Sequence, residues 1–276
     1  MDNPSPIEVE IEGMKLSLLR QGTAPKTLVF LHGNSGCKDV FFKQFLHFKN
    51  THFSALAIDL PGHGQSDNAC TPETTYTIPG YADLIAKLIK ALGIRAYILI
   101  GWSLGGNIAL EMAGAGNAAK GLMIFGAPPV GPGMENIDKA YLPATFETAI
   151  GNSQATKDDI MAYVRSIYGT LDPIPETFYQ CALRTEGKAR QIMVEHWMGG
   201  NDGYNQYQTA AQWENPICVV HGEQDPFVSL EYLTTLPWRN LWRDKIFTRA
   251  NCGHAPFIEA PAYFNTLLEE FAKHVL

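Results

Sequence analysis

Short apolar runs alternate with helical stretches along most of this chain, and this alternation sets the class of fold. Each run has the length of a strand and ends at Gly, Asp or His; the runs cover residues 27–32, 54–59, 96–101, 121–126 and 216–221, with a weaker sixth at 245–249. Such runs are typical of strands buried on both faces of a sheet. Strands separated by helices favour a parallel, doubly wound sheet. We therefore predict an α/β fold with a mostly parallel sheet, edged by an antiparallel hairpin over residues 7–20.

Three stretches have the periodicity of helices. In residues 81–92, apolar side chains at positions 84, 85, 88, 89 and 92 share one helical face, and Gly93 follows as a stop signal. Residues 104–113 and 262–275 are predicted as two further helices.

The strand pattern stops after residue 129 and resumes at Pro216. Between these points the sequence contains many aromatic residues and short helical pieces such as 157–168, and it has no run typical of a buried strand. We predict a helical cap over residues 130–212, inserted between two parts of an α/β core, residues 1–129 and 213–276.

Length and charge exclude several function classes. The chain has 276 residues, which can bury a full core, and its 21 basic and 28 acidic side chains give a net charge of −7. This charge provides no basic field for nucleic acid or an anionic membrane. No apolar run reaches the length of a membrane span, and residues 1–25 do not have the pattern of a signal peptide. We therefore expect no nucleic-acid partner and no membrane association.

The five cysteines are scattered, odd in number and without a CxxC pair; they are Cys37, Cys70, Cys181, Cys218 and Cys252. Such usage does not indicate a disulfide framework and is typical of a reducing compartment. We expect a soluble cytoplasmic protein.

The candidate nucleophile is Ser103, in the pattern Gly-Trp-Ser-Leu-Gly at positions 101–105. This G-x-S-x-G follows a predicted strand directly and precedes a predicted helix directly. A serine on so sharp a turn has a strained backbone, and glycines two residues away on each side avoid a collision. The context therefore predicts a nucleophilic serine rather than a glycine-rich turn.

A serine nucleophile needs a base and an acid that orients it. His254 follows the predicted strand at 245–249, and Asp225 follows the strand at 216–221, so both are expected at the sheet edge that carries Ser103. Glu223 is the alternative acid, but it comes only two residues after the strand end. The chain order serine, acid, histidine is that of α/β-hydrolases.

Acyl transfer also needs donors for the developing oxyanion. The backbone N–H of Leu104, directly after the nucleophile, is one candidate. The backbone N–H of Asn34, in the loop His-Gly-Asn-Ser-Gly at positions 32–36, is the other. His32 itself is expected to support this loop.

Several motifs together resemble the α/β-hydrolase superfamily. They are LHGNSG, DLPGHGQS, GWSLGG, HGEQDPF and CGHAPFIEAP. The combination of HGNSG, TYTIPGYADLI, GWSLGGNIALEMA and GHAPFIEAP is most similar to the bacterial, quorum-quenching N-acyl-homoserine lactonases of α/β-hydrolase type. That group can use Glu as the triad acid, where this chain has Asp225. The resemblance also implies a cap tyrosine near the lactone, for which Tyr163 is the match and Tyr168 the alternative.

The resemblance implies a substrate that is a small ester or lactone with an acyl chain. Trp102, Phe146 and Trp197 are candidate residues for binding it, although aromatic residues at helical spacing also build cores. No cofactor and no metal are expected, because GHGQSDN lacks the further histidines of the metal-dependent lactonases. Arg184 and Arg190 are expected to be solvated.

Other functions on the same residues stay open. A general carboxylesterase would use the same triad, as would a carbon–carbon bond hydrolase, although the latter usually has Trp where this chain has Ala255. A ligand receptor on a hydrolase fold could also keep the triad without turnover. The sequence sets neither the acyl-chain length nor the oligomeric state.

Overall fold

The structure is a computed structural model that describes residues 4–145, 151–199 and 203–276. In these ranges, eight strands form one sheet in the order β1-β2-β4-β3-β5-β6-β7-β8. The strands are β1 (Ser5–Ile11), β2 (Met14–Gln21), β3 (Lys26–Leu31), β4 (Ser54–Ile58), β5 (Ala96–Trp102), β6 (Leu122–Phe125), β7 (Ile217–Gly222) and β8 (Phe247–Arg249). The pairings from β4 to β8 are parallel, whereas β1–β2 and β2–β4 are antiparallel. The predicted α/β sheet with an antiparallel hairpin at its edge is therefore confirmed.

The central strands are apolar because both of their faces are covered. All residues of β4, β6 and β7 are buried, and so are most residues of β3 and β5. The register pairs Leu31 with Gly101, and Trp102 with Phe125. The carboxyl ends of β3, β5 and β6 therefore lie close together, and the loops that follow them meet at one edge of the sheet.

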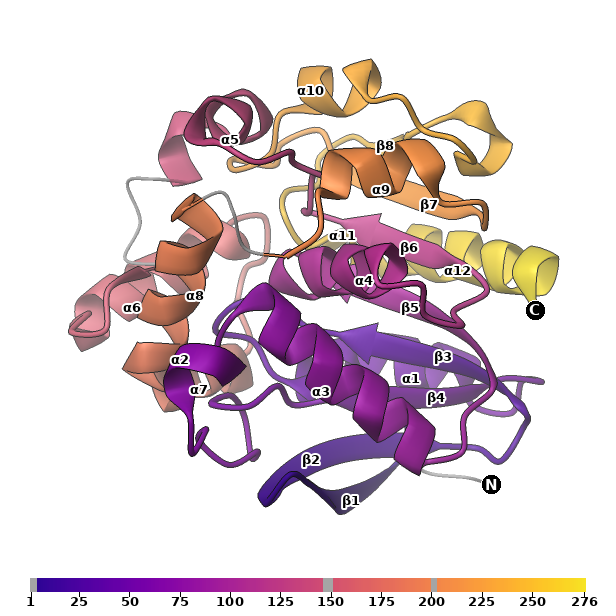
Figure 1. Ribbon diagram of the computed structural model, residues 1–276, viewed down its shortest axis with the longest axis horizontal. Coiled ribbons are helices and arrows are strands. Elements are labelled where there is room, and N and C mark those ends of the chain that lie inside the picture. The colour runs from indigo at the N-terminus through magenta and orange to yellow at the C-terminus, as the bar shows by residue number, and fades with distance from the viewer. Residues whose placement is uncertain (1–3, 146–150, 200–202) are drawn as a thin grey trace.

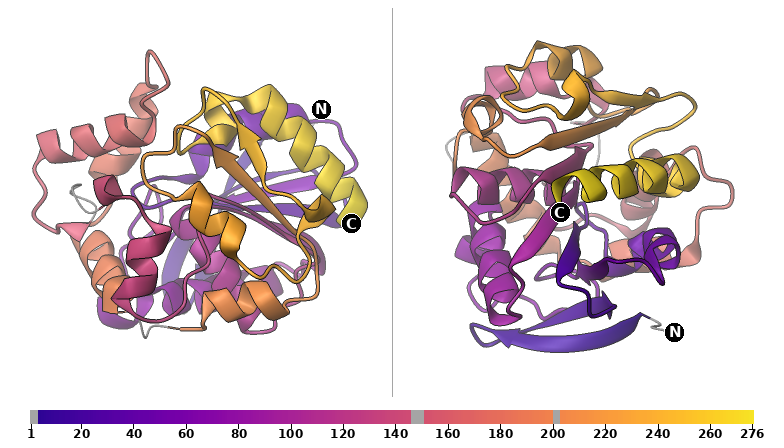
Figure 2. Two further views of the ribbon diagram at one scale, coloured as in Figure 1. Left: turned by 90° about the horizontal axis from the view of Figure 1, so that it is seen from above. Right: turned by 90° about the vertical axis from the view of Figure 1, so that its right-hand side faces the viewer.

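Helices cover both faces of the sheet. Helices α3 (Ile78–Ala91), α4 (Leu104–Gly114) and α9 (Gln206–Gln212) pack together in front of it, while α1 (Phe42–Phe48), α11 (Pro256–Glu259) and α12 (Pro261–Val275) pack behind it (Figures 1 and 2). Helix α3 begins three residues before the predicted start at residue 81. The reason is local: the side chain of Thr77 accepts a hydrogen bond from the Gly80 N–H and caps the helix there.

The segment between β6 and β7 contains helices and no strand in its described residues. We call four of its helices the cap helices: α5 (Met134–Ala140), α6 (Lys157–Ile167), α7 (Glu176–Arg184) and α8 (Gly187–Gly199). Helices α6, α7 and α8 lie together beyond one end of the sheet (Figures 1 and 2). The start of α6 is fixed by a capping box between Thr156 and Asp159. Two short α-helices, α2 (Pro72–Thr75) and α10 (Leu230–Thr235), lie outside this segment.

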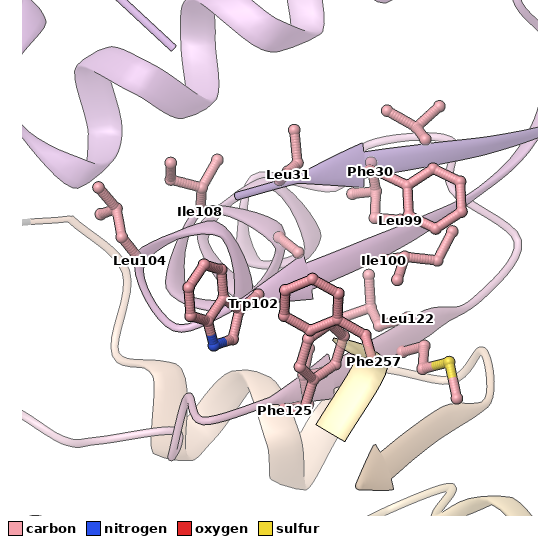
Figure 3. Packing of buried hydrophobic residues seen from close by; sticks show 14 of the residues in the cluster. Phe30, Leu31, Leu99, Ile100, Trp102, Leu104, Ile108, Leu122, Phe125 and Phe257 are labelled. Atoms are coloured by element: carbon pink, nitrogen blue, oxygen red, sulfur yellow. The ribbon is translucent and has the colours of Figure 1, made fainter. Parts of the chain in front are cut away.

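The core lies on both sides of the strands that surround the Ser103 turn. Phe30 and Leu31 from β3, Leu99 and Ile100 from β5, and Phe125 from β6 pack with Phe257 of α11 and Ile108 of α4 (Figure 3). These side chains are essentially inaccessible to water. A close-packed apolar layer of this kind holds the strand ends rigid, because protein interiors resist small displacements.

The expectation that the cysteines form no disulfide is wrong for one pair. Cys37, in the loop after β3, forms a disulfide with Cys181 of α7, and their Cα atoms are 5.8 Å apart. The two residues are separated by 144 positions, so no local spacing in the sequence could indicate that they meet.

Within the described ranges, no helix combines the length and the apolar composition that crossing a membrane requires.

Candidate active site

Ser103 lies at the turn between β5 and α4, with φ 52° and ψ −119°. Few residues other than glycine adopt a positive φ, and strained positions of this kind cluster at functional sites. The Ser103 N–H donates to the Phe125 carbonyl at 2.9 Å, and the Ser103 carbonyl accepts the Gly106 N–H at 2.8 Å. Strand β6 and the first turn of α4 thus hold the strained residue, and its side chain stays partly exposed.

The two glycines of the G-x-S-x-G pattern are required by close contacts. A methyl group on Gly101 would lie 2.4 Å from the Gly105 carbonyl oxygen, and one on Gly105 would lie 2.1 Å from the Leu31 carbonyl oxygen. Both distances are shorter than any real carbon–oxygen contact. Helix α4 can therefore approach β3 and β5 closely only with glycine at both positions.

His254 and Asp225 meet at the same edge of the sheet. Nδ1 of His254 lies 2.9 Å and 3.0 Å from the two carboxylate oxygens of Asp225. Oδ1 of Asp225 also accepts the backbone N–H groups of Phe227 and Val228. Burial alone would raise the pKa of Asp225, but the charge of His254 and these hydrogen bonds outweigh it and lower the pKa. The carboxylate therefore stays ionised and accepts the Nδ1 proton of His254.

The alternative acid is separated from His254. Glu223 is exposed, and its backbone N–H donates to the Arg249 carbonyl at 3.0 Å. Asp225 is buried. Of the two acids left open by the sequence, Asp225 is the one in contact with the histidine.

The ring and the backbone of His254 are fixed from three sides. The Phe227 ring packs edge-on against the imidazole, with centroids 4.9 Å apart. A methyl group on Gly126 would lie 2.6 Å from the imidazole Cε1, so only glycine leaves room there. From the core, the Trp102 indole N–H donates to the His254 carbonyl at 2.9 Å. Trp102, a predicted substrate-binding residue, is only 1% exposed and supports the histidine loop from behind.

The two predicted oxyanion donors lie beside Ser103. Leu104 is the first residue of α4, so its N–H has no acceptor within the helix, and a helix N-terminus favours negative charge. Asn34 lies in the loop after β3 and lines the same cavity as Ser103. In that loop Gly33 passes close to the serine, since a methyl group on Gly33 would lie 3.1 Å from the Ser103 Cβ.

Buried polar contacts anchor this loop. Nε2 of His32 accepts the Leu60 N–H at 3.0 Å, which requires a neutral ring; burial lowers the pKa of His32 accordingly. Further on, the Lys38 ammonium forms a buried ion pair with Asp59, 2.7 Å long. His32 therefore has the supporting place that the sequence indicated, below the oxyanion loop.

A cavity of about 50 Å³ opens over Ser103. Residues from the core and from the cap helices line it together: Asn34, Ile78, Ser103, Leu104, Asn107, Tyr141, Thr145, Tyr163, Met193, Val194, Trp197, Phe227 and His254. Tyr163 and Trp197, two candidate substrate-binding residues, thus line the same cavity as Ser103. Tyr168, the alternative tyrosine, packs against Trp102 and Phe178. Phe146 lies outside the described residues.

One charged residue of the site was missed. Arg190 of α8 is only 3% exposed, so the expectation that it is solvated is wrong, whereas Arg184 is exposed. Nε of Arg190 donates to the Ser35 hydroxyl at 2.9 Å, and a second nitrogen of its guanidinium donates to the Ala182 carbonyl. Arg190 thus links α8 and α7 to the oxyanion loop. No local pattern marks this role, because its partners are distant in the sequence.

The part of the chain that the structure describes contains no cluster of metal-binding side chains. Among these residues, no three His, Cys, Asp or Glu side chains are grouped to hold an ion. What the site does bring together is a strained serine, a histidine held by a buried carboxylate, and backbone N–H groups at a helix N-terminus. This combination suits nucleophilic acyl transfer.

The chain is similar in structure and in sequence to several known proteins. A structure of a mutant of the N-acyl homoserine lactonase AidH, complexed with N-hexanoyl homoserine lactone, is similar with a TM-score of 0.90 and 34% identity, over 97% of both chains. The esterase RhEst1 from Rhodococcus sp. has the same fold, with a TM-score of 0.78 and 21% identity over 99% of both chains. The dihydrolipoyllysine-residue acetyltransferase component of an acetoin cleaving system from Cupriavidus necator is 25% identical, over 95% of this chain and 67% of that protein. The sequence profile of the alpha/beta hydrolase family matches residues 28–267, and the chain therefore belongs to this family.

Proposed function

We propose that the protein is a serine hydrolase that opens the lactone ring of N-acyl-homoserine lactones. The observation that carries the proposal is that Ser103, at a strained turn, and His254, held by Asp225, line one cavity. The choice of a lactone is supported by the similarity to a lactonase that is 34% identical over nearly the whole chain.

The first half of the reaction forms an acyl-enzyme. Asp225 holds the Nδ1 proton of His254, which leaves Nε2 as the base. Nε2 removes the hydroxyl proton of Ser103 as the oxygen attacks the lactone carbonyl. The N–H groups of Asn34 and Leu104 stabilise the negative charge on the carbonyl oxygen. The ring C–O bond then breaks, and the alkoxide leaves with the proton from His254.

The second half releases the product. Water gives a proton to His254 and attacks the ester on Ser103, and the serine oxygen leaves with that proton. Because the leaving hydroxyl stays attached to the acyl group, it competes with water by closing the ring again. Tyr163 lines the cavity, and its burial raises its pKa, so its hydroxyl stays protonated and can hold the released oxygen away from the ester.

The cap helices define where the acyl chain lies. Met193 and Val194 of α8 and Ile78 of α3 give the cavity an apolar wall. Such a wall seats a hydrocarbon chain and excludes bulk water, which strengthens the hydrogen bonds to the oxyanion. We include in the proposal that residues 130–212 act as a cap on the two core segments.

Proton release from N-hexanoyl-homoserine lactone in a pH-stat tests the proposal, with the wild type beside Ser103→Ala. We expect steady turnover by the wild type and a loss of about 10⁴-fold or more in the variant. Mass spectrometry should show the substrate plus one water with its amide intact. Release of free homoserine lactone would identify an amidase instead. Hydrolysis of p-nitrophenyl esters without lactone turnover would identify a carboxylesterase, and binding without turnover would identify a receptor.

A further inference from the structure

The apolar cavity over Ser103 contains two buried polar atoms without a partner among the described residues. Oδ1 of Asn107 accepts no hydrogen bond, and the indole N–H of Trp197 donates none. Asn107 lies on α4, one turn after Ser103, and is 6% exposed. Trp197 lies on α8, in the cap. Both side chains line the cavity that contains Ser103 and His254.

The surroundings fix both side chains in place. The amide nitrogen of Asn107 lies 3.5 Å from the Ser103 backbone carbonyl oxygen, and the Asn107 side chain also forms a hydrogen bond with the Tyr141 hydroxyl. The backbone carbonyl of Asn107 accepts the Gln206 side-chain N–H at 3.2 Å. The Tyr141 ring packs edge-on against the Trp197 ring, with centroids 4.8 Å apart. Both side chains are therefore held against their neighbours at the wall of the cavity.

Leaving such atoms unpaired costs about 1–3 kcal/mol each, so buried polar groups nearly always have a partner. One of the two is an acceptor and the other a donor. A ligand that satisfies both needs an N–H and a C=O close together, and a secondary amide offers this pair.

We infer that Asn107 and Trp197 bind the secondary amide of the substrate: Asn107 Oδ1 accepts its N–H, and the Trp197 indole donates to its C=O. This inference rests on the proposed function and deepens it, because it names the residues that select an N-acyl substrate over a plain ester or lactone. An unpaired polar group in a site discriminates strongly against a substrate that leaves it unpaired.

A second cavity explains where the chain beyond the amide goes. It has a volume of about 250 Å³ and shares Ile78 and Trp197 with the cavity over Ser103. A group bound by the Trp197 indole therefore lies at the boundary between the two cavities. The attacked carbonyl lies on the Ser103 side of this boundary, and an acyl chain that extends past Ile78 and the apolar wall of the first cavity continues into the second cavity.

The test compares matched substrates with and without the amide. The lactone pair is N-hexanoyl-homoserine lactone and 2-heptyl-γ-butyrolactone. The ester pair is the methyl ester of N-hexanoylglycine and methyl nonanoate, in which the amide has the same position relative to the attacked carbonyl. For each pair, the ratio of kcat/KM with the amide to kcat/KM without it is measured in a pH-stat.

We expect Trp197→Phe and Asn107→Ala each to lower this ratio about tenfold. Trp238→Phe is the matched control, because its indole N–H donates to the Leu233 carbonyl and it does not line either cavity. The ratio should stay unchanged in this control. A ratio unaffected in both Trp197→Phe and Asn107→Ala would overturn the inference, since a purely structural role would lower both rates of a pair alike.

The two proposals fail in different ways. Turnover of the lactones with an unaffected ratio overturns amide recognition and leaves the lactonase in place. Turnover of the esters alone, with a lowered ratio, overturns the lactonase and supports amide recognition. If none of the four compounds is hydrolysed, calorimetric titration of Ser103→Ala with the same compounds gives the ratio from dissociation constants, and equal affinity or no binding of both members overturns the inference.

Discussion

Two backbone N–H groups decide what a substitution at Asp225 does. They belong to Phe227 and Val228, and both donate to Oδ1. In Asp225→Asn the amide oxygen would keep these bonds, so the NH₂ group would face Nδ1 of His254. Nδ1 would then have to accept a hydrogen bond, and the ring proton would lie on Nε2. A protonated Nε2 cannot remove the hydroxyl proton of Ser103. We expect kcat to fall by about 10³–10⁴-fold.

Steady-state hydrolysis beside near-ultraviolet circular dichroism checks this expectation, because the fold should be retained. Glu223→Gln is the matched control, since Glu223 is exposed and two residues away. It should keep wild-type rates. A larger loss in Glu223→Gln than in Asp225→Asn would assign the orienting role to Glu223.

Tyr163 and Tyr168 give a second comparison at the scale of single residues. Tyr163 lines the cavity over Ser103, and burial keeps its hydroxyl protonated by raising its pKa. Tyr163→Phe removes only this donor, so we expect kcat on the lactone to fall about tenfold with an unchanged pH profile. Tyr168→Phe serves as the control, because that ring packs against Trp102 and Phe178. Equal effects in the two variants would remove Tyr163 from the mechanism.

At the scale of elements, a disulfide and a hydrogen bond join the loop after β3 to the cap helices. One is the disulfide between Cys37 and Cys181, and the other is the hydrogen bond from Arg190 to Ser35. The disulfide closes a loop of 144 residues, and a crosslink over so long a segment restricts the unfolded chain strongly. We expect reduction to lower the free energy of unfolding by about 2–4 kcal/mol.

Urea unfolding with and without dithiothreitol measures this difference. Cys181→Ser should be less stable than the wild type and insensitive to the reductant. Cys70→Ser is the control, because Cys70 is a free, exposed cysteine, and it should respond to the reductant as the wild type does. Equal stability of the wild type in both conditions would show that the crosslink does not stabilise the fold.

The elements also show what local sequence patterns can and cannot predict. The runs at 27–32, 54–59 and 96–101 match β3, β4 and β5 within one residue, because their apolar composition reports burial on both faces. The Ser103 turn was equally predictable, because its glycines form a local G-x-S-x-G pattern, although the contact that requires Gly105 is with Leu31, far away in the sequence. Arg190 was not, because its burial depends on how α8 docks on a loop that is 155 residues distant.

For the whole molecule, the mostly parallel sheet follows from the alternation of strands and helices, while the order of its strands and the contents of the cavity do not. The cavity combines residues of α3, α4, α6 and α8, and only the assembled structure shows which side chains of each helix meet. Tyr163 was found because it matches a motif position. Asn107 was not, since an asparagine inside a helix carries no signal of its own until the cap helices lie over it.

A pair of buried histidines makes the whole molecule sensitive to acid. His32 and His63 are fully buried, with ring centroids 5.1 Å apart. Burial lowers the pKa of both histidines. The neighbouring His32 lowers the pKa of His63 further, whereas the carboxylate of Asp59 offsets part of the lowering at His32. Protonation of His32 at Nε2 would also break its bond from the Leu60 N–H.

The sign of the effect follows from the two states of each ring. Below about pH 6.5 the unfolded chain binds protons on both histidines, whereas the folded protein binds them only at lower pH. The free energy of unfolding should therefore fall as pH decreases from about 6.5 to the lowered pKa values, by on the order of 1 kcal/mol per histidine between pH 7 and 5.5. Urea unfolding across this range measures the slope. His63→Gln should make it shallower, and His52→Gln, at an exposed position, should leave it unchanged. A wild-type stability that does not change with pH in this window would show that the two rings accept protons in the folded state as readily as in the unfolded chain.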